Sequence, residues 1–496
     1  MPRATTEQGA HPTAGQAGPP RTGRHANTTL VVLFMSLAGL AFSVLQSLVA
    51  PALPVLVDDL DTTTGGVSWV ISAYLLSASV ATPILGRLGD MLGKQRMLLV
   101  VLVFLGLGTV VAALAPNIGV LIVGRVLQGA GGAIVPLSIG IARDELPRER
   151  VSMTVGLLSA MFGIGGGLGI VLAGPIVDHL GWRWLFWLPF AAIVAAIVGV
   201  LFGVPESPVR APGRVDLPGA ALLSIGLTAL LLAITQGSDW GWRSAVTIAL
   251  FVVGAVVLAA FVLVELRVRE PLVNMRLMTL RGVWTTNLTG LIFGFAMFGA
   301  FLLVPMLLEL PAITGYGFGK TVTQAGILLL PMAGAMLVSG ILAGVLSRRY
   351  GPKVPLTLGA VLLAGGFVGA AVAHETVAQL IGTIVVAGLG VGLAFAAMSN
   401  AIIDAVPATH TGEATSVNAI TRTVGGSVGT AVVAAVISAN TTPLGVPSET
   451  AFSTGFWVCA AVGMLAILSA LVLPATRRPE ATEPTAGEPG LAESAA

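Results

Sequence analysis

Long apolar runs separated by short polar segments make up most of the chain. A helix needs roughly 20 residues to cross a hydrocarbon core of about 30 Å. Runs of about that length begin near Thr29, Val67, Met97, Ile118, Ser152, Trp184, Leu217, Ala245, Trp284, Thr321, Val354, Val377, Thr415 and Ser453. The pattern predicts an all-α integral membrane protein with 14 transmembrane helices, because helices satisfy their own backbone hydrogen bonds in lipid. The first run continues to about Leu56 without a cleavage site, so we expect a retained helix and not a signal peptide.

Basic residues are distributed unequally between alternate loops. An even number of spans places both termini on one side, and assigning that side to the cytoplasm puts 20 of the 25 Lys and Arg residues inside. Three lie outside and two within spans, namely Arg183, Arg243 and Lys320, and Arg125 and Arg422. The bias predicts that both termini are cytoplasmic. The excess of Arg over Lys and the abundance of Ala and Gly favour a bacterial source, hence the bacterial plasma (inner) membrane.

Two sequence features occur twice. The segment GRLGDMLGKQR, residues 86–96, returns in degraded form as GVLSRRYGPK, residues 344–353, and a Gly-rich run at 163–174 returns around 425–429. We therefore expect two six-helix bundles with two helices inserted between them, an architecture used by transporters. The expected units are a disordered cytoplasmic tail (1–28), the N-terminal bundle (29–204), a linker with two inserted transmembrane helices (205–282), the C-terminal bundle (283–475) and a second disordered tail (476–496).

Composition excludes several classes of function. Hydrophobic residues make up 55% of the chain and charged residues 10%, against roughly 25% charged in soluble domains. The net charge is +2 and the basic residues are scattered, so we expect no nucleic-acid partner. The single cysteine, Cys459, cannot form a disulfide within the chain, and no His, Asp and Glu cluster lies at membrane depth. We expect no metal, no cofactor and no enzymatic activity; residues 314–321 resemble a P-loop but lack its first glycine.

Several motifs resemble those of one transporter family. GRLGDMLGKQR fits the loop motif Gly-x-Leu-x-Asp-x-x-Gly-Arg/Lys-x-Arg of the major facilitator superfamily, and LIVGRVLQGAGGA, residues 121–133, fits its fourth-span motif. The segments WVISAYLL, GWRWLFWLP and VPATHTGEATSVNAITRTVGGSVGTA resemble the 14-span drug:proton antiporter branch, and the likeness covers residues 29–475. The resemblance implies the major facilitator fold and a monomeric secondary active transporter. Such a protein exports small lipophilic organic compounds or antibiotics across the plasma membrane in exchange for protons, by alternating access.

The chain departs from the branch at three places. Leu45 and Gln46 stand where the first span usually carries an Asp. Gly165 and Gly166 replace a Gly-Pro pair, and Arg348 replaces the Asp of the second loop motif. Proton-coupled uptake of a small organic solute therefore remains the alternative to export. We expect a lipophilic neutral, zwitterionic or monocationic substrate.

The loop motif supplies the candidate gating residues. Asp90 is expected to pair with Lys94, with Arg96 or with a neighbouring helix N-terminus when the cytoplasmic side is closed. The alternative is an ordinary solvated charge at the membrane edge. The gating set predicted from the resemblance is Gly86, Asp90, Gly93, Lys94 and Arg96.

A second set is predicted for transport and coupling. Arg125 lies seven residues inside its span and costs roughly 2.5 to 3.5 kcal/mol to insert, so it needs a task or a structural partner. Gln128, one turn further on, can share its site, and Gln46 occupies the place of the missing acid. Glu309, at the outer end of the ninth span, is the candidate for proton exchange, with a solvated helix-end charge as the alternative. Close helix packing is expected at Gly163, Gly165, Gly166, Gly167, Gly169, Gly174 and Pro175.

Overall fold

The protein is almost entirely helical. The computed structural model describes residues 27–210, 216–442 and 446–474, and over these residues it holds 14 helices that are long and apolar enough to cross a membrane. The predicted number of spans and the all-α class are confirmed. The two expected tails, apart from their edges, lie outside the described residues.

The first half of the molecule contributes six spans. They are formed by α1 (Thr28–Leu48), α3 (Thr64–Leu92), α4 (Lys94–Ala113), α5 (Ile118–Gln128) with η2 (Gly129–Ala133) and α6 (Ile134–Glu145), α7 (Arg148–Leu180) and α8 (Trp184–Gly203). A buried apolar core, which includes Leu45, Leu102, Leu137 and Phe186, is shared by these helices.

The first span is less regular than the sequence pattern predicted, and the fourth contains the 3₁₀ turn η2 between α5 and α6. The expectation of one helix continuing to Leu56 is wrong, because α1 ends at Leu48 and is followed by η1 (Ala50–Ala52) and a short α2 (Leu53–Asp59). Pro51 and Pro54 stand at the starts of these two elements. Proline has no N–H to donate to the preceding turn, so the helix breaks there.

The second half contributes six further spans. They are α12 (Arg281–Glu309), α13 (Val322–Tyr350), α14 (Lys353–Val372), α15 (Val377–Ala405), α16 (Thr411–Ala439) and α17 (Glu449–Val472). Short turns η3 (Ala312–Thr314) and η4 (Ala408–His410) precede α13 and α16. This half has its own buried core, which includes Phe293, Leu363, Phe367 and Phe456.

Two helices stand between the halves in sequence. They are α9 (Leu217–Trp240) and α10 (Ala245–Glu265), which pack against each other, while α9 also contacts α3 and α16. Only 17% of the apolar window of α10 is buried inside the protein, so most of its surface is left for lipid. A short α11 (Met275–Met278) leads from this pair into α12.

The two most extensive contacts between the halves are made by two pairs of helices. α3 packs against α16, and α7 packs against α13. The sequence repeats relate α3 to α13 and α7 to α16, so the two contacts are equivalent under an exchange of the halves. Such an arrangement is expected of two related six-helix units that face each other around a central site.

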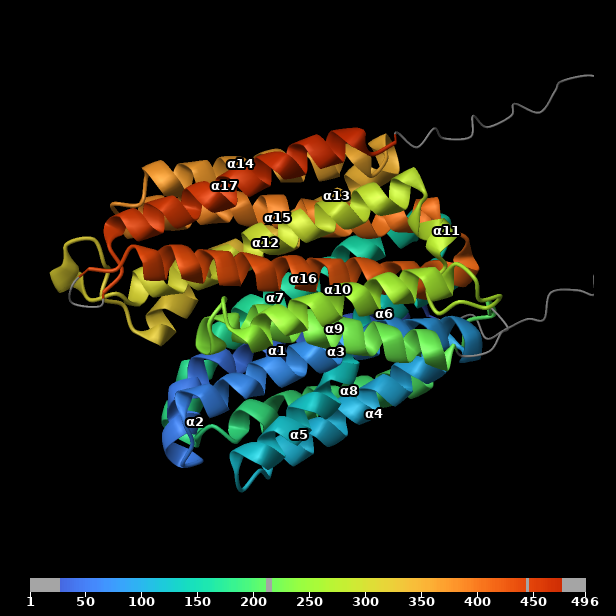
Figure 1. Ribbon diagram of the computed structural model, residues 1–496. Helices are drawn as coiled ribbons and strands as arrows, with labels where there is room; N and C mark the ends of the chain where they lie inside the picture. Colours follow the sequence, from blue (N-terminus) through green and yellow to red (C-terminus); the bar gives the residue numbers. More distant parts are fainter. Residues whose placement is uncertain (1–26, 211–215, 443–445, 475–496) are drawn as a thin grey trace, which may run out of the picture.

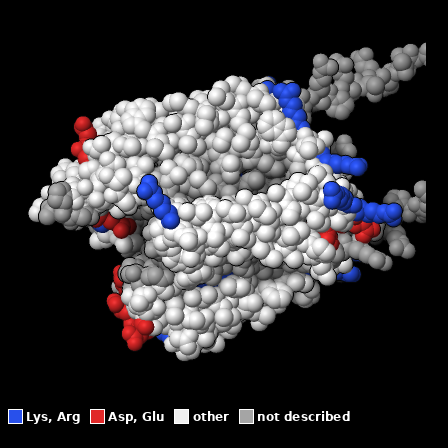
Figure 2. All heavy atoms as spheres, in the orientation of Figure 1, with Lys and Arg blue, Asp and Glu red and all other residues white. Residues whose placement is uncertain are grey.

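Charge is concentrated at the two ends of the bundle. α1 begins and α17 ends at the same end, which we call the terminal face (Figure 1). Figure 2 shows Lys, Arg, Asp and Glu gathered at the ends on the visible side, with an almost uncharged belt between them. This belt is the surface that a bilayer would cover.

Candidate functional site

At the terminal face, Asp90 joins the two halves. It lies near the end of α3, is fully buried, and its carboxylate accepts the backbone N–H groups of Gly412 (3.2 Å) and Glu413 (3.0 Å). These N–H groups belong to the first turn of α16, which has no helical partners for them and carries the positive end of the helix dipole. A neighbouring helix N-terminus was one of the partners predicted for Asp90. In the structure this partner is the N-terminus of α16, in the other half.

Glycine makes this contact close enough for the hydrogen bonds. A Cβ on Gly86, one turn before Asp90, would collide with Ser416 and with the backbone of Gly412. A Cβ on Gly412 would in turn meet Gly86 and the Asp90 carboxylate. Gly93 ends α3 with φ of 119°, a conformation that side chains with a Cβ rarely adopt.

A buried lysine lies beneath Asp90. Lys94 Nζ is 3.5 Å from Asp90 Oδ1 and 2.5 Å from Asp144 Oδ2, and all three side chains are buried. Ser207 donates a hydrogen bond to the same oxygen of Asp144. The lysine lies between two carboxylates and therefore offsets part of their mutual repulsion in a poorly solvated site.

Arg143 forms a second bridge between the halves. Its guanidinium donates to Thr411 Oγ1 at 2.6 Å and to the Val406 carbonyl at 2.8 Å, so α6 is tied to the end of α15 and the start of α16. We call the contacts of Asp90 with α16 and of Arg143 with Thr411 and Val406 the terminal latch. Arg96, predicted as a partner of Asp90, instead lies 3.4 Å from Glu206 and is largely exposed.

A cavity of about 830 Å³ lies between the halves, on the other side of the latch from the terminal face. Its lining comes from the first part of α3, the later parts of α1, α9 and α16, and the middle of α7 and α12. Single residues of η1, α5, α13 and α15 and Trp242, which follows α9, complete it. Its volume falls in the range of about 300 to 1,000 Å³ that is typical of small-molecule sites. Most of its lining is apolar, and the predicted residues Gln46, Arg125 and Gly166 all contribute to it.

Arg125 is held in the cavity wall without a carboxylate. Its Nε donates to the Val70 carbonyl at 3.0 Å, its Nη1 donates to Gln128 Oε1 at 2.7 Å, and its guanidinium lies 4.4 Å from the centre of the Tyr74 ring. Gln128 Nε2 in turn donates a hydrogen bond to Thr109 Oγ1 at 3.2 Å, and Gln128 does not line the cavity. The backbone contact predicted for a structural arginine and the cavity position predicted for a functional one are both present.

The remaining predicted residues lie in different surroundings. Glu309 is exposed at the end of α12 and does not line the cavity, so its part in proton exchange stays a prediction. Gly165 and Gly169 pack against α1, while Gly167 and Gly174 pack against α13. A Cβ on Gly166 would meet no atom within 4 Å, because this glycine faces the cavity. The surroundings of Gly163 lie outside the described part of the structure, and Pro175 is an interior residue of α7.

The sequence matches a known family profile over most of its length. Residues 35–430 and, overlapping them, 310–495 match the profile of the Major Facilitator Superfamily. The chain belongs to the Major Facilitator Superfamily. The resemblance seen in the loop and fourth-span motifs is thereby confirmed, and membership in this family of transporters indicates a transporter.

Bacterial relatives in the superfamily align over most of the chain. The multidrug transporter protein MdtP of Bacillus subtilis is 28% identical over 427 residues, which are 84% of this chain and 77% of the relative. The tetracenomycin C resistance and export protein of Streptomyces glaucescens is 26% identical over 429 residues, 86% of this chain and 79% of the relative. The solved structure of the superfamily's proton:xylose symporter XylE is similar in fold, with a TM-score of 0.63 at 14% identity over 90% of this chain and 96% of that one.

Several residues of the site were not predicted from the sequence. Asp144 and Arg143 lie in the last turn of α6, at the end of the fourth span, and Gly412 and Glu413 open α16, 322 and 323 residues after Asp90. The adjacent Arg and Asp at the end of an apolar run could have indicated a site at the membrane edge. Their partners could not be predicted from the sequence, because they depend on how the two halves of this superfamily member dock.

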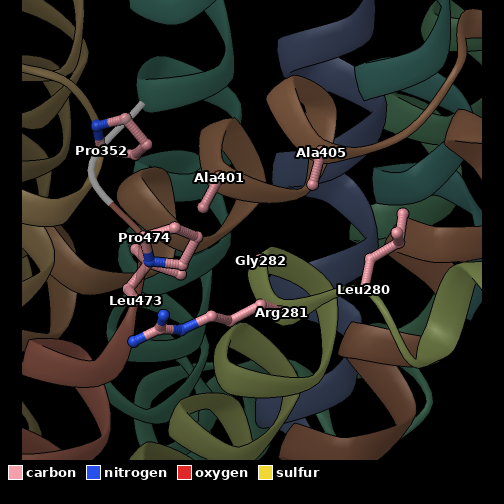
Figure 3. A pocket seen from close by; sticks show the side chains of 8 residues that line it. All are labelled: Leu280, Arg281, Gly282, Pro352, Ala401, Ala405, Leu473 and Pro474. Carbon is pink, nitrogen blue, oxygen red and sulfur yellow. The ribbon is translucent and has the colours of Figure 1, made fainter. Parts of the chain in front are cut away.

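A second cavity, of about 260 Å³, lies at the terminal face of the second half between the ends of four helices (Figure 3). Arg281 points along its edge and donates from Nε to the Val472 carbonyl at 3.1 Å. Lys353 donates to the neighbouring Leu471 carbonyl at 2.7 Å. These bonds satisfy the end of α17, so the two cations have a structural task there.

Proposed function

We propose that the protein exports small lipophilic organic compounds or antibiotics across the bacterial plasma membrane in exchange for protons, by alternating access. The observation that supports this most is the cavity between two repeated halves, which is closed on one side by a polar latch. Hydrogen bonds of a carboxylate and a guanidinium can be replaced by water when the halves separate, so the latch suits a reversible gate. In this proposal the gate is Gly86, Asp90, Gly93, Lys94 and Arg143, and the protein catalyses no chemical reaction.

The direction of transport rests on two arguments. The excess of basic residues in the loops of the terminal face supports a cytoplasmic position for both termini. With that orientation, the described state is closed to the cytoplasm. The names of the relatives, a multidrug transporter and a tetracenomycin C resistance and export protein, favour export.

Proton-coupled uptake is the second candidate. The fold is shared with a proton:xylose symporter, and the same rocking motion serves either direction. Export in exchange for protons remains the better-supported proposal because two relatives that align over most of the sequence are named a multidrug transporter and a resistance and export protein. The proton gradient supplies enough energy for export, since one charge crossing 100 mV releases about 2.3 kcal/mol. This energy corresponds to roughly fifty-fold accumulation of substrate.

Efflux from cells tests the proposal. Cells expressing the protein are loaded with a panel of anionic, neutral and cationic fluorescent dyes, and retention is compared with cells carrying an Asp90→Asn variant of matched membrane abundance. We expect faster loss of at least one dye from wild-type cells and no difference after a protonophore is added with ATP maintained. Efflux that persists without the gradient excludes secondary coupling, and dye accumulation above the control favours uptake.

A further inference from the structure

The electrostatics of the cavity differ from those of its surroundings. At the terminal face, cations and carboxylates are paired, as with Lys94, Asp90 and Asp144. Among the side chains that the structure describes around the cavity, Arg125 is the one charged group, and no carboxylate lines the wall. The other polar groups are hydroxyls and an amide, such as Ser43, Gln46 and Ser427, which carry no net charge.

The positive charge of Arg125 is not neutralised within the described protein. Its partners are a carbonyl, an amide oxygen and an aromatic ring, none of which carries a full negative charge. A guanidinium has five N–H donors, and two of them are used in these hydrogen bonds. In a site of low dielectric constant, such a charge acts over several ångströms and attracts anions.

A second arginine reinforces this potential. Arg422 of α16 lies beside the cavity, with its guanidinium 4.5 Å from the centre of the Phe395 ring, and Phe395 lines the wall. Within the described residues, the Arg422 side chain makes no hydrogen bond and no salt bridge. The next residue, Thr423, and Gly426 one turn on both line the cavity. Each half of the molecule therefore contributes one cation to this region.

Two of the five aromatic residues in the described wall of the cavity already face a cation. Aromatic faces bind cations, but the Tyr74 face already carries Arg125 and the Phe395 face already carries Arg422. A cationic ligand would approach two guanidinium groups with no carboxylate to offset the repulsion. Phe298, Phe301 and Leu302 remain as apolar surface for the body of a ligand.

We propose that the cavity binds amphiphilic organic anions, with a carboxylate or phenolate in the positive potential of Arg125, which is buried in the wall beside Tyr74, and an apolar or aromatic framework against α12. The inference rests on the proposed function for the direction of transport but not for binding. It differs from the neutral, zwitterionic or monocationic substrate expected from the sequence. That expectation was based on the absence of acidic residues from the spans, whereas the structure places a positively charged side chain in the cavity wall.

Direct binding to the purified full-length protein in nanodiscs tests the proposal. The probes are fluorescein and a rhodamine methyl ester, which share a xanthene framework but carry opposite charge at slightly alkaline pH. We expect fluorescein to bind at least tenfold more tightly than the rhodamine, by fluorescence anisotropy. Equal or tighter binding of the rhodamine, or binding of neither dye, overturns the proposal.

Matched variants separate charge from folding. Ser427→Asp places a carboxylate in the cavity wall and Ser427→Asn is its uncharged control of the same shape. We expect Ser427→Asp to weaken fluorescein binding about tenfold and to strengthen rhodamine binding, while Ser427→Asn leaves the ratio of the two affinities near the wild-type value. An equal loss in both variants, or an unchanged ratio in Ser427→Asp, contradicts an electrostatic basis for selection. Arg125→Met should lower fluorescein affinity more than rhodamine affinity, and equal losses for both dyes count against the role of the Arg125 charge.

Transport in proteoliposomes distinguishes this inference from the proposed function. At slightly alkaline pH fluorescein is a dianion, so its exchange for a proton moves three charges in the same electrical direction, whereas exchange of the rhodamine monocation moves none. Fluorescein export that responds to an imposed potassium diffusion potential supports both proposals. Proton-driven transport of the rhodamine alone leaves the exporter standing and removes the anionic substrate. Fluorescein binding and transport without proton dependence leaves the substrate class and removes the coupling.

Discussion

The two most extensive contacts between the halves are equivalent by the sequence repeat but are built differently. Where α3 meets α16, the contact ends in the charged and hydrogen-bonded residues of the terminal latch. Where α7 meets α13, small residues bring the backbones together: a Cβ on Gly156 would collide with Gly340, and one on Gly344 would collide with Ser152. We call this second contact, at Gly156, Gly326, Gly340 and Gly344, the glycine seam.

The difference assigns separate tasks to the two contacts. Polar groups at a membrane edge can exchange their partners for water, so the latch can open without a large cost in buried apolar area. Closely packed helix backbones have no such substitute, and the seam is held by van der Waals contact along its length. We infer that the seam keeps the halves together during the motion and that the latch controls which state is populated.

The largest effect is expected at the base of the latch. Lys94→Met leaves Asp90 and Asp144 buried near each other without their cation, and breaking a buried ion pair in this way costs about 3 to 5 kcal/mol. We expect lost transport and reduced membrane abundance. The double variant Lys94→Met with Asp144→Asn removes one of the two charges and should recover part of the abundance, measured by quantitative blotting. Without any recovery, the charge balance assigned to Lys94 is wrong.

The seam should respond in stability. Gly156→Val adds bulk against the backbone of Gly340, and overpacking of this kind costs about 1 to 3 kcal/mol. We expect a lower melting temperature of the purified protein together with weaker efflux. The control is Gly365→Val on α14, where an added Cβ meets no atom within 4 Å. Equal shifts in melting temperature for both variants would remove the special role of the seam.

A smaller, purely conformational effect is expected at the latch itself. Asp90→Asn keeps the shape but loses charge-assisted hydrogen bonds, which contribute about 1.5 to 3 kcal/mol. The population closed at the terminal face should fall roughly ten- to a hundredfold relative to the open one, with abundance unchanged. Distances between spin labels at the ends of α3 and α16 report this shift, and efflux should fall with it.

Arg348→Ala is the matched test at the equivalent place on α13. Arg348 stands where the repeat would match Asp90, so it cannot accept the N–H groups of a helix start as a carboxylate does. We expect a smaller loss of efflux than for Asp90→Asn. An equal or greater loss would contradict the asymmetry between the latch and the seam.

Sequence alone was sufficient for the parts of the fold that depend on the bilayer. Span number follows from the length of apolar runs, because the hydrocarbon thickness fixes the length of a helix that crosses it. The break after Leu48 was available from Pro51 and Pro54, but the short turn at Gly129–Ala133 was not. Glycines there pack against Ser77, Phe42 and Thr82, so the turn depends on neighbours from other helices.

A site residue could be predicted from the sequence where its charge is energetically costly within a membrane span. Arg125 drew attention because a charge within a span needs a reason, and the structure places it in the cavity wall. Asp90 came from a local motif, but its partners at Gly412 and Glu413 depend on docking across more than 300 residues of chain. Glu309 was chosen for its position along the sequence, which gives no information on the face of α12 that it occupies.

The smallest effect is expected for Arg96, the member of the predicted gating set that lies outside the latch. Its side chain is 68% exposed and pairs with Glu206 at 3.4 Å, and exposed pairs of this kind contribute about 0.2 to 1 kcal/mol. Glu206 also accepts the backbone N–H groups of Gln95 and Arg96 at 3.3 Å each, and Arg96→Ala keeps both of these bonds at the start of α4. Efflux should therefore stay within about twofold of the wild type. Glu206→Gln weakens the backbone contacts as well and should cost more; if Arg96→Ala instead matches Asp90→Asn, the gate extends beyond the latch to the start of α4.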